Sequence, residues 1–226
     1  MTILGADGEG ELRAVLDSLG YDLEPSILIG GWATNARVGG EISHDIDLII
    51  TDQSLRQVLP QRLDEYSENE LHSGGKKARG NADGVHVDAY FPYESKLGSK
   101  LLLDVGVLTR FVDPDFTVNG WLMLTLDAHI ATKIAALIDR HATEKGKKDA
   151  REIVALVDAG GDGRKVIEVI VAAAGRPKGD IVDDIRMVFQ LLPKLADLNQ
   201  KARRHYANLA REWIEEAQIQ TKEAKA

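Results

Sequence analysis

The chain has 226 residues, enough for one sizeable hydrophobic core or two smaller ones. Hydrophobic residues make up 44% of it and charged residues 28%, which is typical of globular proteins in water. Cysteine is absent, which excludes disulfides and thiolate metal sites and favours a cytoplasmic location. No basic stretch leads into an apolar run at the N-terminus, and no segment approaches about 18 apolar residues, so we expect neither secretion nor a membrane partner. A net charge of −8 argues against a general nucleic-acid coat protein but permits a local basic groove.

The first half of the chain alternates predicted helices and strands. Apolar periodicity, glycines and turn residues indicate the elements, and Pro60 predicts a kink or break in the third helix. In chain order they are a helix at 11–19, a strand and Gly-Gly turn at 27–31, a helix at 32–38, a strand at 45–50, a helix at 54–66, a turn-rich connection with room for a short strand at 74–84, and a strand at 85–91.

The second half is predicted to be helical. Short apolar runs at 101–103, 105–108 and 121–124 suit strands, and from Leu126 onward the apolar residues recur with helical spacing. We therefore predict an α+β protein, with a mixed sheet and flanking helices over residues 1–125 and a helical bundle over residues 126–226.

The strongest chemical signal is a Gly-Gly turn followed by an Asp-x-Asp strand. Gly30 and Gly31 allow the backbone to approach a phosphate closely, and the helix that follows presents free N–H groups to it. Asp45 and Asp47 lie two residues apart on an apolar strand, so both carboxylates point to the same side. Adjacent carboxylates repel one another unless a cation lies between them, and Mg²⁺ binds carboxylates and substrate phosphates together.

This combination resembles the nucleotidyltransferase fold of the polymerase-β superfamily over residues 25–92. The resemblance implies two Mg²⁺ ions, a nucleoside triphosphate substrate, and a third carboxylate on a later strand. Asp88 is the matching position, because it lies on an alternating strand with His86 and Tyr90 on the same side; Asp83 and Asp104 are its rivals. Many members have serine where this chain has Gly31, so here the contact to the triphosphate is expected to come from the backbone.

A second set of charged residues lies in the helical half. Lys133 and Arg140 share a helix face, and Asp149 lies at the edge of an apolar stripe, where a charge is costly unless it is paired. We expect Lys133 or Arg140 to pair with Asp149. The set resembles the helical motif of AbiEii-type nucleotidyltransferases, the toxins of certain toxin–antitoxin pairs. This resemblance implies that Lys133 contacts the triphosphate and that Asp149 belongs to the site, with Arg140 a further cation there. The alternative is a surface lysine and an aspartate stabilised by the helix dipole.

The function predicted from these residues is Mg²⁺-dependent transfer of NMP from an NTP to an acceptor hydroxyl, with release of pyrophosphate. The AbiEii resemblance implies RNA, tRNA or protein as acceptor and a cognate antitoxin as partner. An aminoglycoside or lincosamide nucleotidyltransferase is the alternative, and a non-catalytic binding member of the fold is a third reading. Three basic clusters are candidate contacts for an RNA end, and the first of them, Lys76-Lys77-Ala78-Arg79, is the preferred one; the others begin at Lys145 and Lys201.

Overall fold

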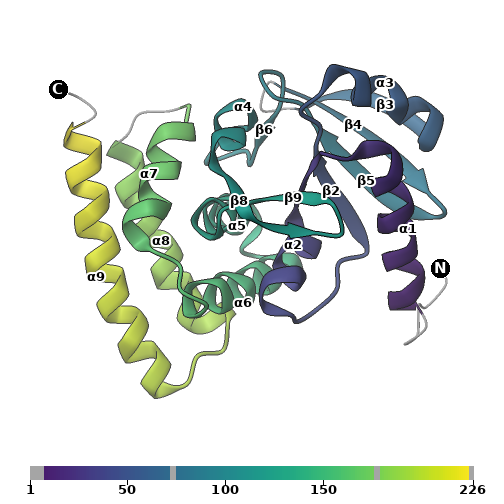
Figure 1. Cartoon of the computed structure of the whole chain (residues 1–226). Helices are drawn as coiled ribbons and strands as arrows, with labels where there is room; N and C mark the ends of the chain where they lie inside the picture. The colour runs from purple at the N-terminus through teal and green to yellow at the C-terminus, as the bar shows by residue number, and fades with distance from the viewer. Residues whose placement is uncertain (1–7, 72–74, 176–178, 224–226) are drawn as a thin grey trace. The chain divides into compact units, whose positions relative to one another are not determined.

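The computed structural model describes residues 8–71, 75–175 and 179–223, and its fold is α+β, as predicted (Figure 1). The chain divides into two compact units. The first takes in the residues up to Ser95 together with Val112–Leu124, and the second takes in Lys96–Phe111 together with the residues from Thr125 onward. The chain therefore leaves the first unit, returns to it, and leaves it again.

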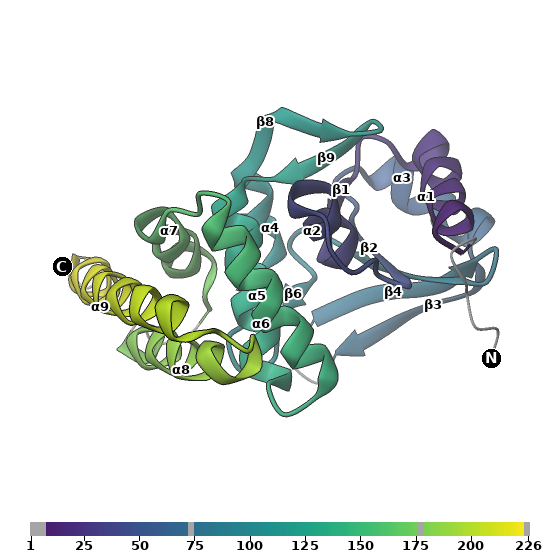
Figure 2. The same cartoon turned by 90° about the horizontal axis from the view of Figure 1, so that it is seen from below.

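The first unit is built on a mixed sheet, which has seven strands among the described residues, in the order β3-β4-β5-β2-β1-β9-β8. Strand β2 pairs antiparallel with β1 and parallel with β5, and β3 and β4 lie side by side as a long antiparallel pair (Figure 2). Its elements are α1 (Gly8–Leu23), β1 (Ile27–Ile29), α2 (Gly30–Val38), β2 (Asp45–Ile49), α3 (Gln53–Arg62), β3 (Asp64–Leu71), β4 (Gly75–Ala82), β5 (Val85–Tyr90), β8 (Val112–Val118) and β9 (Trp121–Leu124).

Alternation along the strands gives the sheet an apolar side and a polar side. On the apolar side, side chains such as Leu28, Leu48 and Val87 form one buried cluster with residues from α1, α2 and α3, among them Trp32. Successive residues of a strand point to opposite sides. The aspartates of β2 and β5 therefore point away from this cluster.

Two predictions for the first unit are wrong in detail. The helix predicted at 54–66 ends at Arg62 because Leu63 turns extended (φ −116°), and Asp64–Leu71 is the edge strand β3. The connection predicted at 74–84 holds a full strand, β4, from Gly75 to Ala82, while Gly74 lies outside the described residues. The sequence of β3 is almost entirely polar, so no apolar alternation indicated a strand there.

The second unit is mainly helical, as predicted from Leu126 onward. Val105–Leu108, however, is a short helix rather than the predicted strand, and the Asp104 side chain caps it by accepting a hydrogen bond from the Val107 N–H at 3.1 Å. No helix among the described residues is long and apolar enough to cross a bilayer. The elements are β6 (Lys96–Leu97), β7 (Leu103–Asp104), α4 (Val105–Leu108), the 3₁₀ helix η1 (Thr109–Phe111), α5 (Leu126–Arg140), α6 (Glu144–Asp158), α7 (Gly163–Ala173), α8 (Gly179–Leu195) and α9 (Gln200–Glu223).

Candidate functional site

The Gly-Gly turn connects β1 directly to α2, and Gly30 has two reasons to be glycine. Its φ is +72°, in the left-handed region that side chains rarely adopt. A Cβ at Gly30 would also collide with the Asp47 carboxyl group, lying 3.0 Å from its Cγ and 3.1 Å from its Cβ. Ile29 precedes the helix and supplies no side-chain cap to the first N–H groups of α2. The start of α2 therefore presents its N–H groups close to Asp47.

Gly31 is buried, and Ser43 fills the space that a side chain at Gly31 would need. A Cβ there would lie 2.7 Å from the Ser43 Cβ and 3.0 Å from its Oγ. Ser43 belongs to the loop that enters β2, and its Oγ accepts a hydrogen bond from the Asp45 N–H at 3.4 Å. Gly31 thus has a serine, Ser43, packed directly against it from the loop that enters β2.

The three predicted carboxylates lie on one side of two adjacent parallel strands. Asp47 on β2 is the register partner of Asp88 on β5, and Asp45 is the partner of His86. Register partners on neighbouring strands share a face and lie about 4.8 Å apart. Asp45, Asp47 and Asp88 are all partly exposed, between fully buried apolar neighbours. The structure therefore brings Asp88 next to Asp47, whereas its rival Asp83 lies in the β4–β5 turn and its rival Asp104 caps α4.

Asp88 is held by cations that were predicted only as RNA contacts. Lys77 Nζ lies 2.5 Å from its Oδ2, and the Lys77 side chain is only 8% exposed. Arg79 Nε lies 3.1 Å from Oδ1, and His86 Nε2 lies 3.3 Å from the same oxygen. Strand β4 places Arg79 directly opposite Asp88 and Lys77 opposite Tyr90. Lys77 and Arg79 are therefore site residues that the sequence argument assigned to a different role.

The carboxylate oxygens of the three aspartates are ligands of the kind that a hard divalent cation prefers, and the strand register places them on one side of the sheet. Mg²⁺ prefers carboxylate oxygens, and Asp45, Asp47 and Asp88 offer them from one side of the sheet. Both oxygens of Asp88 are engaged by Lys77 and Arg79, and within the described residues no three acidic or histidine side chains converge closely enough to hold a metal ion. An ion bound by all three aspartates would therefore share the Asp88 carboxylate with Lys77 and Arg79 or displace one of them.

The predicted residues of the helical half form a charge network within the second unit. Arg140 donates to both oxygens of Asp149, through Nε at 2.6 Å and an Nη at 2.8 Å, as one of the two predicted pairings. Lys133 Nζ lies 3.9 Å from Asp149 and 2.5 Å from Glu152, a residue that sequence reasoning missed although it lies one helical turn beyond Asp149. The Lys133 side chain is 6% exposed and that of Asp149 2%. Buried Lys133, Asp149 and Glu152 and the partly exposed Arg140 thus balance one another in charge within this unit.

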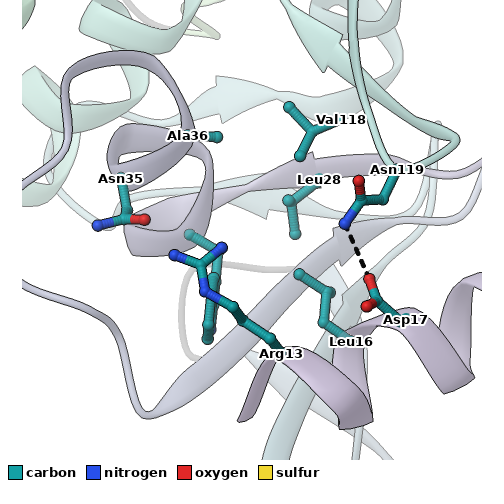
Figure 3. A pocket seen from close by; sticks show the side chains of 9 residues that line it. Arg13, Leu16, Asp17, Leu28, Asn35, Ala36, Val118 and Asn119 are labelled. Atoms are coloured by element: carbon teal, nitrogen blue, oxygen red, sulfur yellow. Dashed lines mark hydrogen bonds between the residues drawn. The ribbon is translucent and has the colours of Figure 1, made fainter. Parts of the chain in front are cut away.

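A cavity of about 320 Å³ lies on the apolar side of the sheet, with Leu16 and Leu28 in its wall (Figure 3). The Arg13 guanidinium lies 5.6 Å from the centre of the Trp32 ring, and Asn119 donates a hydrogen bond of 3.0 Å to Asp17. No residue predicted for the site lines this cavity, whose walls are Arg13, Leu16, Asp17, Leu28, Trp32, Asn35, Ala36, Val118 and Asn119.

Solved structures of several proteins are similar to this chain, and three of them follow. One is ANT(2")-Ia in complex with adenylyl-2"-tobramycin, which is 15% identical over 73% of this chain and 95% of its own, with a TM-score of 0.49. A putative nucleotidyltransferase from Thermotoga maritima is 14% identical over 62% of this chain and 90% of its own, with a TM-score of 0.44. An antigenic nucleotidyltransferase-like protein from Paracoccidioides brasiliensis is 15% identical over 66% of this chain and 76% of its own, with a TM-score of 0.38.

No protein-family description matches the chain, and no curated protein is similar to it in sequence. The function proposed below therefore rests on the residues of the site themselves.

Proposed function

We propose that the protein is a Mg²⁺-dependent nucleotidyltransferase that moves NMP from an NTP to an acceptor hydroxyl. The observation that carries this proposal is the register of β2 and β5, which places Asp47 beside Asp88 with Asp45 on the same side. Gly30, the first residue of α2, lies directly against the Asp47 carboxyl group, so the start of this helix lies beside the carboxylates. Carboxylates and a helix N-terminus at one point suit a triphosphate with its metal ions.

In this proposal the backbone N–H groups of Gly30 and Gly31 bind the triphosphate, because the helix N-terminus carries partial positive charge. Asp45, Asp47 and Asp88 would hold two Mg²⁺ ions, and the chemistry that the ions would supply is neutralisation of phosphate charge and activation of the acceptor hydroxyl. The acceptor oxygen bonds to the α-phosphorus as the bond to the bridging oxygen breaks, and pyrophosphate leaves. Asp88 lies nearest the attacking hydroxyl and takes its proton. Lys77 and Arg79 orient the Asp88 carboxylate before substrates bind.

The proposal assigns catalysis to residues 1–125 and a supporting helical domain to residues 126–226. Within the helical domain, Lys133 and Arg140 are proposed as the cations for the triphosphate, and Asp149 as the residue that holds them. The biological role that follows from the AbiEii resemblance is a toxin that modifies RNA, tRNA or protein and is neutralised by a cognate antitoxin.

A labelling experiment tests this proposal. The protein is incubated with each α-labelled NTP, Mg²⁺ and total RNA, a protein mixture or tobramycin, and the labelled product is identified. Asp45→Asn removes one charge with little change of shape and is expected to abolish labelling, whereas Asp115→Asn, an exposed aspartate on β8, serves as the matched control. Absence of label in every acceptor, with equal growth of cells that express wild-type protein or Asp45→Asn, would contradict the proposal.

A further inference from the structure

The two oxygens of the Asp88 carboxylate have different surroundings. Oδ2 lies 2.5 Å from Lys77 Nζ, and the Lys77 side chain is 8% exposed. Oδ1 lies 3.1 Å from Arg79 Nε and 3.3 Å from His86 Nε2, and these two side chains are 48% and 39% exposed. One oxygen therefore has a buried partner, whereas the other has partners that reach the solvent.

The neighbours of Lys77 on the sheet hold it in place. Strand β4 lies between β3 and β5, and Lys77 is the register partner of Asn69 on one side and of Tyr90 on the other. Its Nζ lies 5.6 Å from the centre of the Tyr90 ring, and an ammonium group near an aromatic ring gains a further favourable interaction. Lys77 is therefore held by a ring as well as by the carboxylate.

The two ion pairs of Asp88 also differ in the free energy needed to break them. Separating Lys77 from Asp88 would leave a buried ammonium group without its carboxylate, and an uncompensated buried charge is strongly destabilising. Separating Arg79 from Asp88 returns a half-exposed guanidinium group to water, and exposed ion pairs contribute little to stability. A metal ion that takes Asp88 as a ligand therefore displaces a cation more readily from Oδ1 than from Oδ2.

We propose that Arg79 is the cation that a divalent metal ion displaces, and that Lys77 stays on Asp88 when the ion binds. Asp88 then offers Oδ1 to the ion, while Lys77 holds Oδ2 and fixes the direction of the carboxylate. Lys77 is a positioning residue of the metal site, and Arg79 is a competitor that occupies Oδ1 until the ion arrives. This inference rests on the proposed function for the ion itself, and it gives separate roles to two cations that both contact Asp88 in the free protein.

Calorimetric titration with Mg²⁺ tests the competition without any transfer of NMP. The variant Arg79→Gln removes the competitor, and Lys76→Gln is the matched control, because it removes the same charge from an exposed residue of β4 whose side chain points to the other side of the sheet. We expect Arg79→Gln to bind Mg²⁺ about fivefold more tightly than wild type, and Lys76→Gln to stay within about twofold of wild type. Equal affinities of the two variants would overturn the inference alone. Absence of Mg²⁺ binding by all three proteins would contradict the proposed function together with the inference.

Side-chain NMR of the ¹⁵N-labelled wild-type protein shows which of the two cations moves. The Arg79 Nε–H and Lys77 ammonium signals are assigned by their loss in Arg79→Gln and Lys77→Arg, and both are followed as Mg²⁺ is added. We expect the Arg79 signal to shift toward that of a solvated arginine, and the Lys77 signal to persist, because burial protects the ammonium group from exchange with water. Loss of the Lys77 signal, or an Arg79 signal that does not move at saturating Mg²⁺, would overturn the inference.

Discussion

The contact between Gly31 and Ser43 predicts a reversal in the effect of one substitution. Gly31→Ala alone should destabilise the protein, because its new Cβ would lie 2.7 Å from the Ser43 Cβ. Overpacking of this kind costs about 1–3 kcal/mol, which exceeds the gain of up to about 1 kcal/mol from alanine in a helix. With Ser43→Gly in the same chain, the nearest atom becomes the Ser43 Cα at 3.6 Å, an ordinary contact. In that background Gly31→Ala should stabilise the protein.

The assay is a double-mutant cycle of urea unfolding for wild type, both single variants and the double variant. We expect a coupling of about 1–3 kcal/mol in favour of the double variant, because the two residues touch. Gly10→Ala is the control, since nothing lies within 4 Å of a Cβ at Gly10 in α1; it should stabilise in either background. Additivity of Gly31→Ala and Ser43→Gly to within about 0.3 kcal/mol would refute the packing argument.

Three further predictions concern other buried or paired groups. Asp149→Ala should lower the free energy of unfolding in urea by about 3 kcal/mol, because it breaks a buried ion pair and leaves the buried Lys133 with Glu152 alone, whereas the exposed Asp183→Ala should lower it by less than about 0.5 kcal/mol. Tyr206→Phe should lower the free energy of unfolding by about 1–3 kcal/mol, measured by thermal unfolding, since the buried hydroxyl donates to Val154 O and Asp158 Oδ1. A change below about 0.3 kcal/mol would argue against these hydrogen bonds. Burial first, and then the hydrogen bond to Glu68, raises the pKa of Tyr66 to about 12. The contribution of Tyr66 to the free energy of unfolding should therefore persist below about pH 10 and be lost as the pH rises to about 12. Absorbance of wild type against Tyr66→Phe follows this titration, and a midpoint near about pH 10 would contradict the prediction.

The strand faces of the site could be predicted from the sequence, because alternation fixes which residues share a side. Asp45 and Asp47 had to point the same way, and the apolar residues between and after them had to be buried, as Ile46 and Leu48 are. Which strands are neighbours is not encoded in alternation. The pairing of Asp47 with Asp88 was predicted through the family resemblance, and the register of β2 and β5 supplies the geometry.

The contact between Arg79 and Asp88 was missed, although a local signal for it exists. Asp83 and Gly84 form a two-residue turn with φ values of +49° and +80°, and Asp-Gly between strands is a strong hairpin signal. Such a turn pairs Ala82 with Val85, and counting outward along both strands then pairs Arg79 with Asp88, as observed. The glycine-rich sequence before this turn favours a loop, which is why residues 74–84 are predicted as a connection with room for only a short strand.

Other features could not be derived from local sequence at all. The short apolar run Val105–Leu108 fits a strand or a helix equally well, and the cap from Asp104 favours the helix only once the backbone is in place. Strand β3 is an edge strand with polar residues on both sides, so it lacks the apolar period that predicts a strand. The return of Val112–Leu124 to the first unit depends on tertiary pairing of β9 with β1.

The central claim is that Asp47, beside Asp88 and Gly30, serves metal-assisted transfer of NMP. The most direct test compares pyrophosphate release from NTP by wild type, Asp47→Asn and Asp115→Asn, with and without Mg²⁺, in the presence of total RNA. Metal-bound phosphate chemistry should make release depend on Mg²⁺ and fall by about a thousandfold or more in Asp47→Asn, with Asp115→Asn like wild type. Release by Asp47→Asn at the wild-type rate, or release unaffected by removal of Mg²⁺, would contradict the account.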